Sequence, residues 1–135
     1  MPRVSSALLL IRIASAVAFL YHGSAILFGT FGGPGPTRFA GILHAPAVIG
    51  YLVGIGEFFG GLGILFGVLT RISAVFIAII MLGAIFFVHL RHGFDIGHGG
   101  FEYALVQLLI ALALVIAGPG GFALGSRISP ALRNL

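Results

Sequence analysis

Long apolar runs divide the chain into four segments, which are separated by short stretches rich in glycine and proline. A helix needs about 20 mainly apolar residues to cross a lipid bilayer. Four segments reach or approach that length, at residues 5–29, 46–69, 72–91 and 101–118. The pattern therefore predicts an all-α membrane protein with four transmembrane helices.

The connections between these segments indicate how the helices are arranged. Only Thr70 and Arg71 separate the second segment from the third, so these two helices are expected to be antiparallel neighbours. In lipid, every backbone polar group must be hydrogen-bonded within the protein. We therefore expect residues 1–135 to form one domain, an up-down four-helix bundle with glycine-rich loops at 30–45 and 92–100.

Composition strengthens this interpretation. Hydrophobic residues make up 59% of the chain and charged residues only 7%, whereas soluble domains carry about 25% charged residues. There is no cysteine, so this chain by itself forms no disulfide, thiolate metal site or iron–sulfur site.

The arginines predict the orientation. Cationic residues concentrate on the cytoplasmic side of membrane proteins, and four arginines flank one side of the bundle against two on the other. Both termini are therefore expected in the cytoplasm. The cations are too sparse for a nucleic-acid footprint. The larger group is Arg3, Arg71, Arg127 and Arg133, and the smaller is Arg38 and Arg91.

Each predicted helix carries an ionisable side chain that its apolar surroundings do not explain. Glu57 lies near the middle of the second helix, where a charge costs at least about 2.5–3.5 kcal/mol. It must be protonated, paired or in contact with water. Arg12 either extends to the membrane interface or pairs with Glu57. A protonated, purely structural Glu57 is the simpler alternative.

The remaining polar groups predict a pocket that opens toward the outer side. His22 and Glu57 fall at compatible depths and are the candidate catalytic pair, exchanging protons with a bound molecule. The other candidate ligand-binding residues are Arg12, Phe19, Tyr21, Phe58, His89, His92, Glu102 and Tyr103.

Three occupants suit such a pocket. Two histidines and two glutamates have the atoms that a metal ion needs, and His22 with His89 could hold a haem. No Glu-x-x-His pair or cysteine is present, so no metal site is predicted. A quinone fits better because histidine and carboxylate can exchange protons with its oxygens near neutral pH.

Four stretches together resemble the DoxX family of small bacterial membrane proteins. They are "LIRIASAVAFLYHGSAILFGTFGGPG", "LVGIGEFFGGLGILFGVLTRISA", "AIFFVHLRHGF" and "ALALVIAGPG". The resemblance covers nearly the whole chain. It implies a four-helix bundle in the bacterial cytoplasmic (inner) membrane, with links to quinone-dependent oxidoreductases such as thiosulfate:quinone oxidoreductase. The positions that match the family pattern are Arg12, His22, Gly23, Glu57, Thr70, Arg71 and Gly118-Pro119-Gly120.

The sequence also departs from this family. Relatives often have a lysine where this chain has Ile26, and their leucine and aspartate after the last turn are replaced by "FALGSRI". The missing lysine argues against an anionic substrate such as thiosulfate.

The leading hypothesis is a quinone-interacting membrane subunit of a redox system. Because no cysteine or cofactor motif is present, electrons must come from a partner oxidoreductase or a bound cofactor. One alternative is a non-enzymatic binder or carrier that uses the same pocket. Another is an assembly scaffold whose glycine-rich second helix, at 46–69, packs on a partner or on a second copy of the chain.

Overall fold

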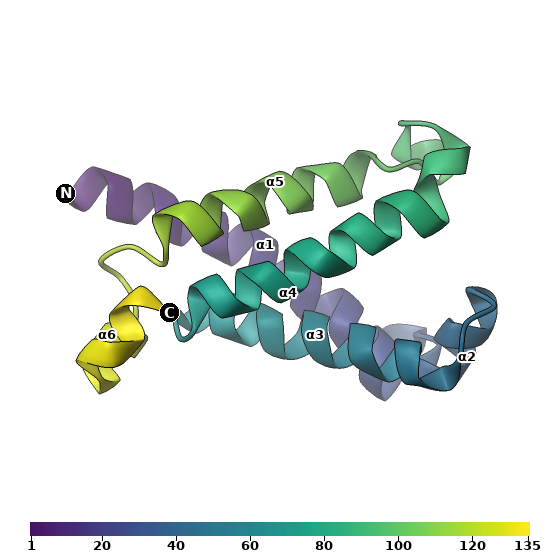
Figure 1. The fold of residues 1–135 in the computed structure, drawn as a ribbon, viewed down its shortest axis with the longest axis horizontal. Coiled ribbons are helices and arrows are strands. Elements are labelled where there is room, and N and C mark those ends of the chain that lie inside the picture. Colours follow the sequence, from purple (N-terminus) through teal and green to yellow (C-terminus); the bar gives the residue numbers. More distant parts are fainter.

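The computed structural model describes residues 1–135 and consists of helices joined by short turns. Four helical rods form the body (Figure 1). They are α1 (Pro2–Phe28), α3 (Ala47–Phe66), α4 (Thr70–Gly83) and α5 (Glu102–Ala117). They lie within a few residues of the predicted segments once the continuation of α4 to His92 is included. A π-helical segment, η2 (Ala84–His89), and a short turn, η3 (Leu90–His92), extend α4.

Five short elements complete the chain, and they sit at the two ends of the body (Figure 1). The α2 end carries α2 and the loop after η3, whereas the terminal end carries both chain termini. The short elements are η1 (Thr30–Gly32), α2 (Gly35–Ile42), η4 (Ile96–His98), α6 (Gly125–Ile128) and η5 (Pro130–Asn134).

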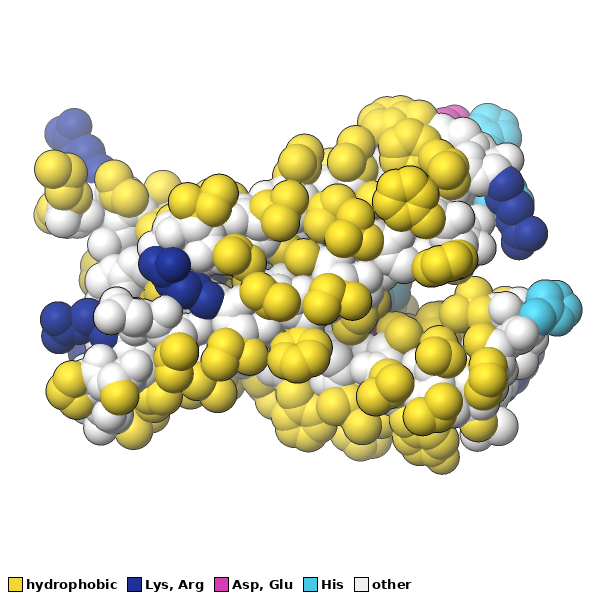
Figure 2. Space-filling model, in the orientation of Figure 1, with side chains coloured by type: hydrophobic (Ala, Val, Ile, Leu, Met, Phe, Trp, Pro, Cys, Tyr) yellow, Lys and Arg dark blue, Asp and Glu magenta, His cyan; other side chains and the backbone are white.

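Three helices are long and apolar enough to cross a membrane: Pro2–Phe28, Ala47–Phe66 and Thr70–His92. The fourth rod, α5, is also apolar but has only 16 residues, or about 24 Å of helix. Figure 2 shows apolar side chains covering the middle of the molecule, with arginine and histidine gathered at its two ends. This is the surface of a multi-pass membrane protein.

The rods pack in the order α1, α3, α4 and α5, and α5 returns to meet α1 along a sparser contact. The core between them is built from small and aliphatic residues, together with the fully buried Phe19. Tight packing also explains the glycines of α3. A Cβ at Gly54 would lie 3.0 Å from Leu27 of α1, and one at Gly60 would lie 3.1 Å from Ile77 of α4.

Gly23 marks the closest approach of α1 to α3. A Cβ at this position would lie 2.5 Å from the backbone nitrogen of Phe58 and 2.9 Å from the carbonyl carbon of Glu57. The two backbones are therefore in direct contact there. This contact places the His22-Gly23 pair of α1 beside the Glu57-Phe58 pair of α3.

Segment 30–45, expected as a loop, folds in part into α2. This helix packs on α3 and, less extensively, on α1, and it buries Ala40. The backbone of Pro36 contacts Gly50 of α3, where no side chain would fit. The sequence pattern did not predict α2, because the helix begins with glycine and proline, which usually mark turns.

Arg12 joins three parts of the terminal end. Its side chain is buried and donates to four carbonyl oxygens. Two belong to Ile64 and Leu65 in the last turn of α3, each at 2.7 Å. The other two belong to Pro119 at 3.0 Å and Phe122 at 2.7 Å. The last carbonyls of a helix lack helical partners and form the negative end of its dipole, so a guanidinium is well placed there.

This arrangement corrects one expectation from the sequence. Arg12 does not pair with Glu57, and the structure contains no ion pair between them. The carbonyl cage also requires glycine nearby. Gly118 and Gly120 adopt positive φ angles of 74° and 78° in the turn that presents Pro119. A Cβ at Gly67 would lie 2.6 Å from Nη2 of Arg12.

The contact at Gly23 can be tested with a single methyl group. Gly23→Ala forces the added Cβ against the α3 backbone and is expected to lower the free energy of unfolding by about 1–3 kcal/mol. SDS-induced unfolding of the purified protein, followed by circular dichroism, measures this change. Gly41→Ala is the control, because Gly41 lies in α2 with open space around it. Equal stability of the two variants would contradict a required backbone contact.

The Arg12 cage makes a second prediction. Arg12→Lys keeps the positive charge, but one ammonium group cannot reach four carbonyls that surround a planar guanidinium. Each lost charge-assisted hydrogen bond costs about 1.5–3 kcal/mol. The same unfolding measurement should therefore show a loss of at least that size. Arg3→Lys, at an exposed position of the same helix, should leave stability unchanged, and an Arg12→Lys protein as stable as wild type would disprove the role of the cage.

Candidate functional site

Polar side chains from α1, α3 and α5 come together in the half of the bundle nearer the α2 end. Glu57 projects from α3 and is buried at 6% exposure. Tyr103 stands at the start of α5, on the side of the bundle where the His22-Gly23 pair of α1 lies beside Glu57. His22 of α1 completes the group, with its ring centroid 5.6 Å from that of Tyr103. These three residues form the candidate site.

Two polar atoms in this site have no hydrogen-bond partner. They are Oε2 of Glu57 and Oη of Tyr103, and both are buried. An unpaired polar group in an apolar environment costs on the order of 1–3 kcal/mol or more, so proteins rarely leave one. Here two of them lie in the same part of the bundle. Glu57 and Tyr103 therefore both have hydrogen-bonding capacity that the protein itself does not use.

His22 gives this site contact with the surroundings. Its side chain is exposed, unlike that of Glu57. Tyr21 packs edge-on against it, with ring centroids 5.3 Å apart. The three groups thus run from a buried carboxyl, past a phenol, to an accessible imidazole.

A buried hydrogen bond lies deeper along the same contact between α1 and α5. The hydroxyl of Ser15 donates to Oε1 of Gln107 at 2.8 Å. Together with His22 and Tyr103, these residues make the contact between the two helices a polar seam. Neither Ser15 nor Gln107 is among the site residues predicted from the sequence, although Gln107, the sole amide side chain in the apolar helix α5, was a usable signal.

An aromatic groove lies where α1 meets Phe58 of α3. It has a volume of about 360 Å³ and is adjacent to the candidate site, because the ring of its lining residue Tyr21 lies 5.3 Å from that of His22. Tyr21 stacks on Phe31 with centroids 4.8 Å apart. The groove is lined by Val17, Leu20, Tyr21, Ser24, Phe31 and Phe58.

Several predicted site residues instead shape the loop at the α2 end. Nδ1 of His89 lies 2.7 Å from the carbonyl oxygen of Gly99. A carboxylate oxygen of Glu102 accepts from the backbone N–H of Ile96 at 3.0 Å. His92 accepts from Nε of Arg91 at 3.2 Å. These groups therefore hold the loop at the α2 end together, and none of them bonds to Glu57.

Phe19 and Arg12 were also predicted to bind the ligand, and the structure gives both of them other contacts. Phe19 is fully buried in the hydrophobic core, against Gly61 of α3. Arg12 is held in its carbonyl cage at the terminal end. The histidines and acids also form no cluster of three or more that could hold a metal ion, so the geometry gives the metal alternative no support.

Asp95 gives the same loop a fixed negative charge. Its carboxylate accepts from the backbone N–H of Gly97 at 2.9 Å and lies 2.7 Å from Nδ1 of His98. Those hydrogen bonds hold the pKa of Asp95 below its usual value. The α2 end therefore carries both carboxylate and cationic groups.

Comparison with known proteins agrees with this architecture. The DoxX family model matches residues 7–90. A protein of Bacillus subtilis (strain 168), described as "Putative oxidoreductase CatD", is 34% identical over 106 residues, which are 78% of this chain and 76% of that relative. No solved structure matches the chain significantly. The family match spans more than half of the chain and includes the helices that carry Arg12, His22 and Glu57, and the chain therefore belongs to the DoxX family.

Proposed function

We propose that this chain is a membrane subunit of a redox system and binds the head group of a quinone among α1, α3 and α5. The observation that carries the proposal is the pair of unpartnered buried atoms on Glu57 and Tyr103. Family membership and the oxidoreductase description of the Bacillus relative support a redox-associated role in the membrane.

The chemistry of the site suits a quinone. A quinone ring carries two carbonyl oxygens that accept hydrogen bonds, and the Tyr103 hydroxyl and a protonated Glu57 are donors. Binding would therefore satisfy both unpartnered groups at once. The neighbouring aromatic groove, which includes Tyr21 and Phe58, offers an apolar surface for the remainder of the molecule.

Protons would pass from the exposed His22 to the buried Glu57 and from there to the quinone. Reduction of a quinone to a quinol takes up two electrons and two protons. Glu57, next to the bound oxygen, would pass a proton and be reprotonated through the accessible His22, whose imidazole can both accept and donate a proton, and a second cycle would deliver the second proton. The electrons would come from a partner oxidoreductase, because no cysteine is present and no redox cofactor motif is found.

We further propose that α5 is the fourth transmembrane helix and that both termini face the cytoplasm of a bacterium, with the chain in the inner membrane. The two termini lie at the same end of the molecule (Figure 1), which requires an even number of crossings. That end also carries the elements with Arg3, Arg71, Arg127 and Arg133, in agreement with the positive-inside rule.

The alternatives fit less of the structure. A non-enzymatic carrier would use the same aromatic groove, but it would not require a carboxyl and a phenol left without partners. A scaffold that docks through the glycines of α3 is disfavoured, because these glycines already contact α1, α2 and α4 within the chain.

Tyr103→Phe tests the proposal directly. The substitution removes only the hydroxyl, so titration of the purified protein with a short-chain quinone should show affinity reduced roughly 5- to 150-fold, the equivalent of about 1–3 kcal/mol. The ligand-free variant should unfold at the same temperature as wild type or higher, because an unpaired buried hydroxyl has been removed. Tyr51→Phe, at an exposed tyrosine of α3, is the matched control.

Glu57→Gln separates binding from proton exchange. Glutamine keeps a hydrogen-bond donor of similar shape but cannot deliver a proton, so quinone affinity should stay within a few fold of wild type. Quinone reduction by membranes that contain the partner enzyme should be lost. Saturable binding that is unaffected by Tyr103→Phe, or no saturable quinone binding at all, would overturn the proposal.

A further inference from the structure

We propose that an anionic phospholipid binds at the terminal end, with its phosphate on Arg71 and an acyl chain along the adjoining face of α4. This site is separate from the candidate quinone site, and neither proposal depends on the other.

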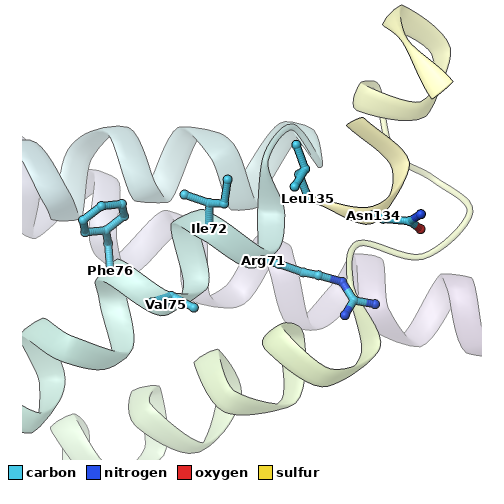
Figure 3. A pocket seen from close by; sticks show the side chains of 6 residues that line it. All are labelled: Arg71, Ile72, Val75, Phe76, Asn134 and Leu135. Atoms are coloured by element: carbon cyan, nitrogen blue, oxygen red, sulfur yellow. The ribbon is translucent and has the colours of Figure 1, made fainter. Parts of the chain in front are cut away.

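A groove of about 210 Å³ lies between the first two turns of α4 and the end of the chain. Figure 3 shows that its polar and apolar parts are separated. The Arg71 guanidinium lies toward Asn134, whereas Phe76 lies at the opposite end. The lining residues are Arg71, Ile72, Val75, Phe76, Asn134 and Leu135.

Arg71 has no partner in the protein. Its Nε is buried without a hydrogen bond, and its guanidinium makes no ion pair. This differs from Arg12, whose guanidinium is held by four carbonyls. The backbone N–H groups of Arg71 and Ile72 are already taken by the main-chain oxygen of Leu135, at 2.6 Å and 3.1 Å. A ligand would therefore be recognised by the arginine side chain, whose planar donors match a phosphate.

The distribution of charge indicates an anionic partner. The terminal end carries five arginines, which are the caged Arg12 together with Arg3, Arg71, Arg127 and Arg133. The three acidic residues lie elsewhere, with Glu57 buried inside the bundle, Asp95 at the start of η4 and Glu102 at the start of α5. The main-chain carboxylate of Leu135 does lie at the terminal end, but it is a single negative group, and the backbone N–H groups of Arg71 and Ile72 already bind it. At a membrane surface, the headgroups of anionic lipids supply the missing charge.

The apolar part of the groove indicates a lipid in preference to a free anion. Ile72, Val75 and Phe76 are exposed at 40%, 42% and 57% and lie on one face of α4. Ile79 continues this face one turn further into the membrane-spanning part of the helix. An acyl chain attached to a phosphate on Arg71 would follow this face in the direction of the bilayer.

The test uses the full chain purified in detergent, with lipid binding counted by native mass spectrometry. Dioleoylphosphatidylglycerol should be retained saturably, at about one molecule per chain. Dioleoylphosphatidylcholine should bind at least tenfold more weakly, because its headgroup has no net charge. Arg71→Gln should weaken phosphatidylglycerol binding at least tenfold, whereas Arg127→Gln, which removes a neighbouring exposed arginine, should leave it within twofold.

A second pair of variants keeps the test decisive if Arg71→Gln fails to fold. Val75→Trp fills the groove without touching the arginine and should also weaken binding at least tenfold. Val106→Trp, at an exposed position of α5 outside the groove, should not. Equal losses in Arg71→Gln and Arg127→Gln would indicate diffuse attraction and overturn the proposal. Competition by millimolar inorganic phosphate that matches the effect of the lipid, with Val75→Trp binding normally, would reduce the site to a simple anion site and also overturn it.

Discussion

The backbone contact between α1 and α3 at Gly23 sets the register on which the rest of this structure depends. With Gly23 against Glu57 and Phe58, the antiparallel helices bring Arg12 to the last turn of α3. Eleven residues of α1, about 16 Å of helix, separate Gly23 from Arg12, and the seven from Glu57 to Ile64 span about 11 Å of α3. A long arginine side chain covers the difference. One close contact therefore positions both the candidate site and the carbonyl cage.

Arg12, Glu57 and Arg71 are all ionisable residues in or beside apolar helices, but they differ in whether their side chains are hydrogen-bonded. Arg12 is fully satisfied by four carbonyls, so its burial is explained by the architecture of the terminal end. Glu57 and Arg71 each retain a buried atom without a partner. In lipid, where water does not compensate for a missing partner, that difference distinguishes a structural group from one that has capacity for a ligand.

The two regions that contain buried polar atoms without hydrogen-bond partners have different surroundings. Glu57 and Tyr103 lie inside the bundle, close to an accessible histidine and an aromatic groove, which suits a flat molecule with polar edges. Arg71 lies at the terminal end above an apolar helix face, which suits a charged headgroup with a hydrocarbon chain. The separation places the proposed quinone site and the proposed lipid site on different helices, so each can be tested by substitutions that leave the other intact.

The sequence alone determined the membrane class, the positions of the four apolar helices and the unusual status of Glu57, because hydropathy and the cost of burying charge are local properties. It also indicated His22 and Tyr103 as neighbours of the site. Only the tertiary structure decided the hydrogen-bonding partners of these side chains. Arg12 donates to backbone carbonyls instead of pairing with Glu57. Glu102 and His89 bond to the backbone of a loop, and Ser15 donates to Gln107. Those outcomes depend on helix rotation and register, which are set by close contacts between residues far apart in the chain, such as Gly23 with Phe58.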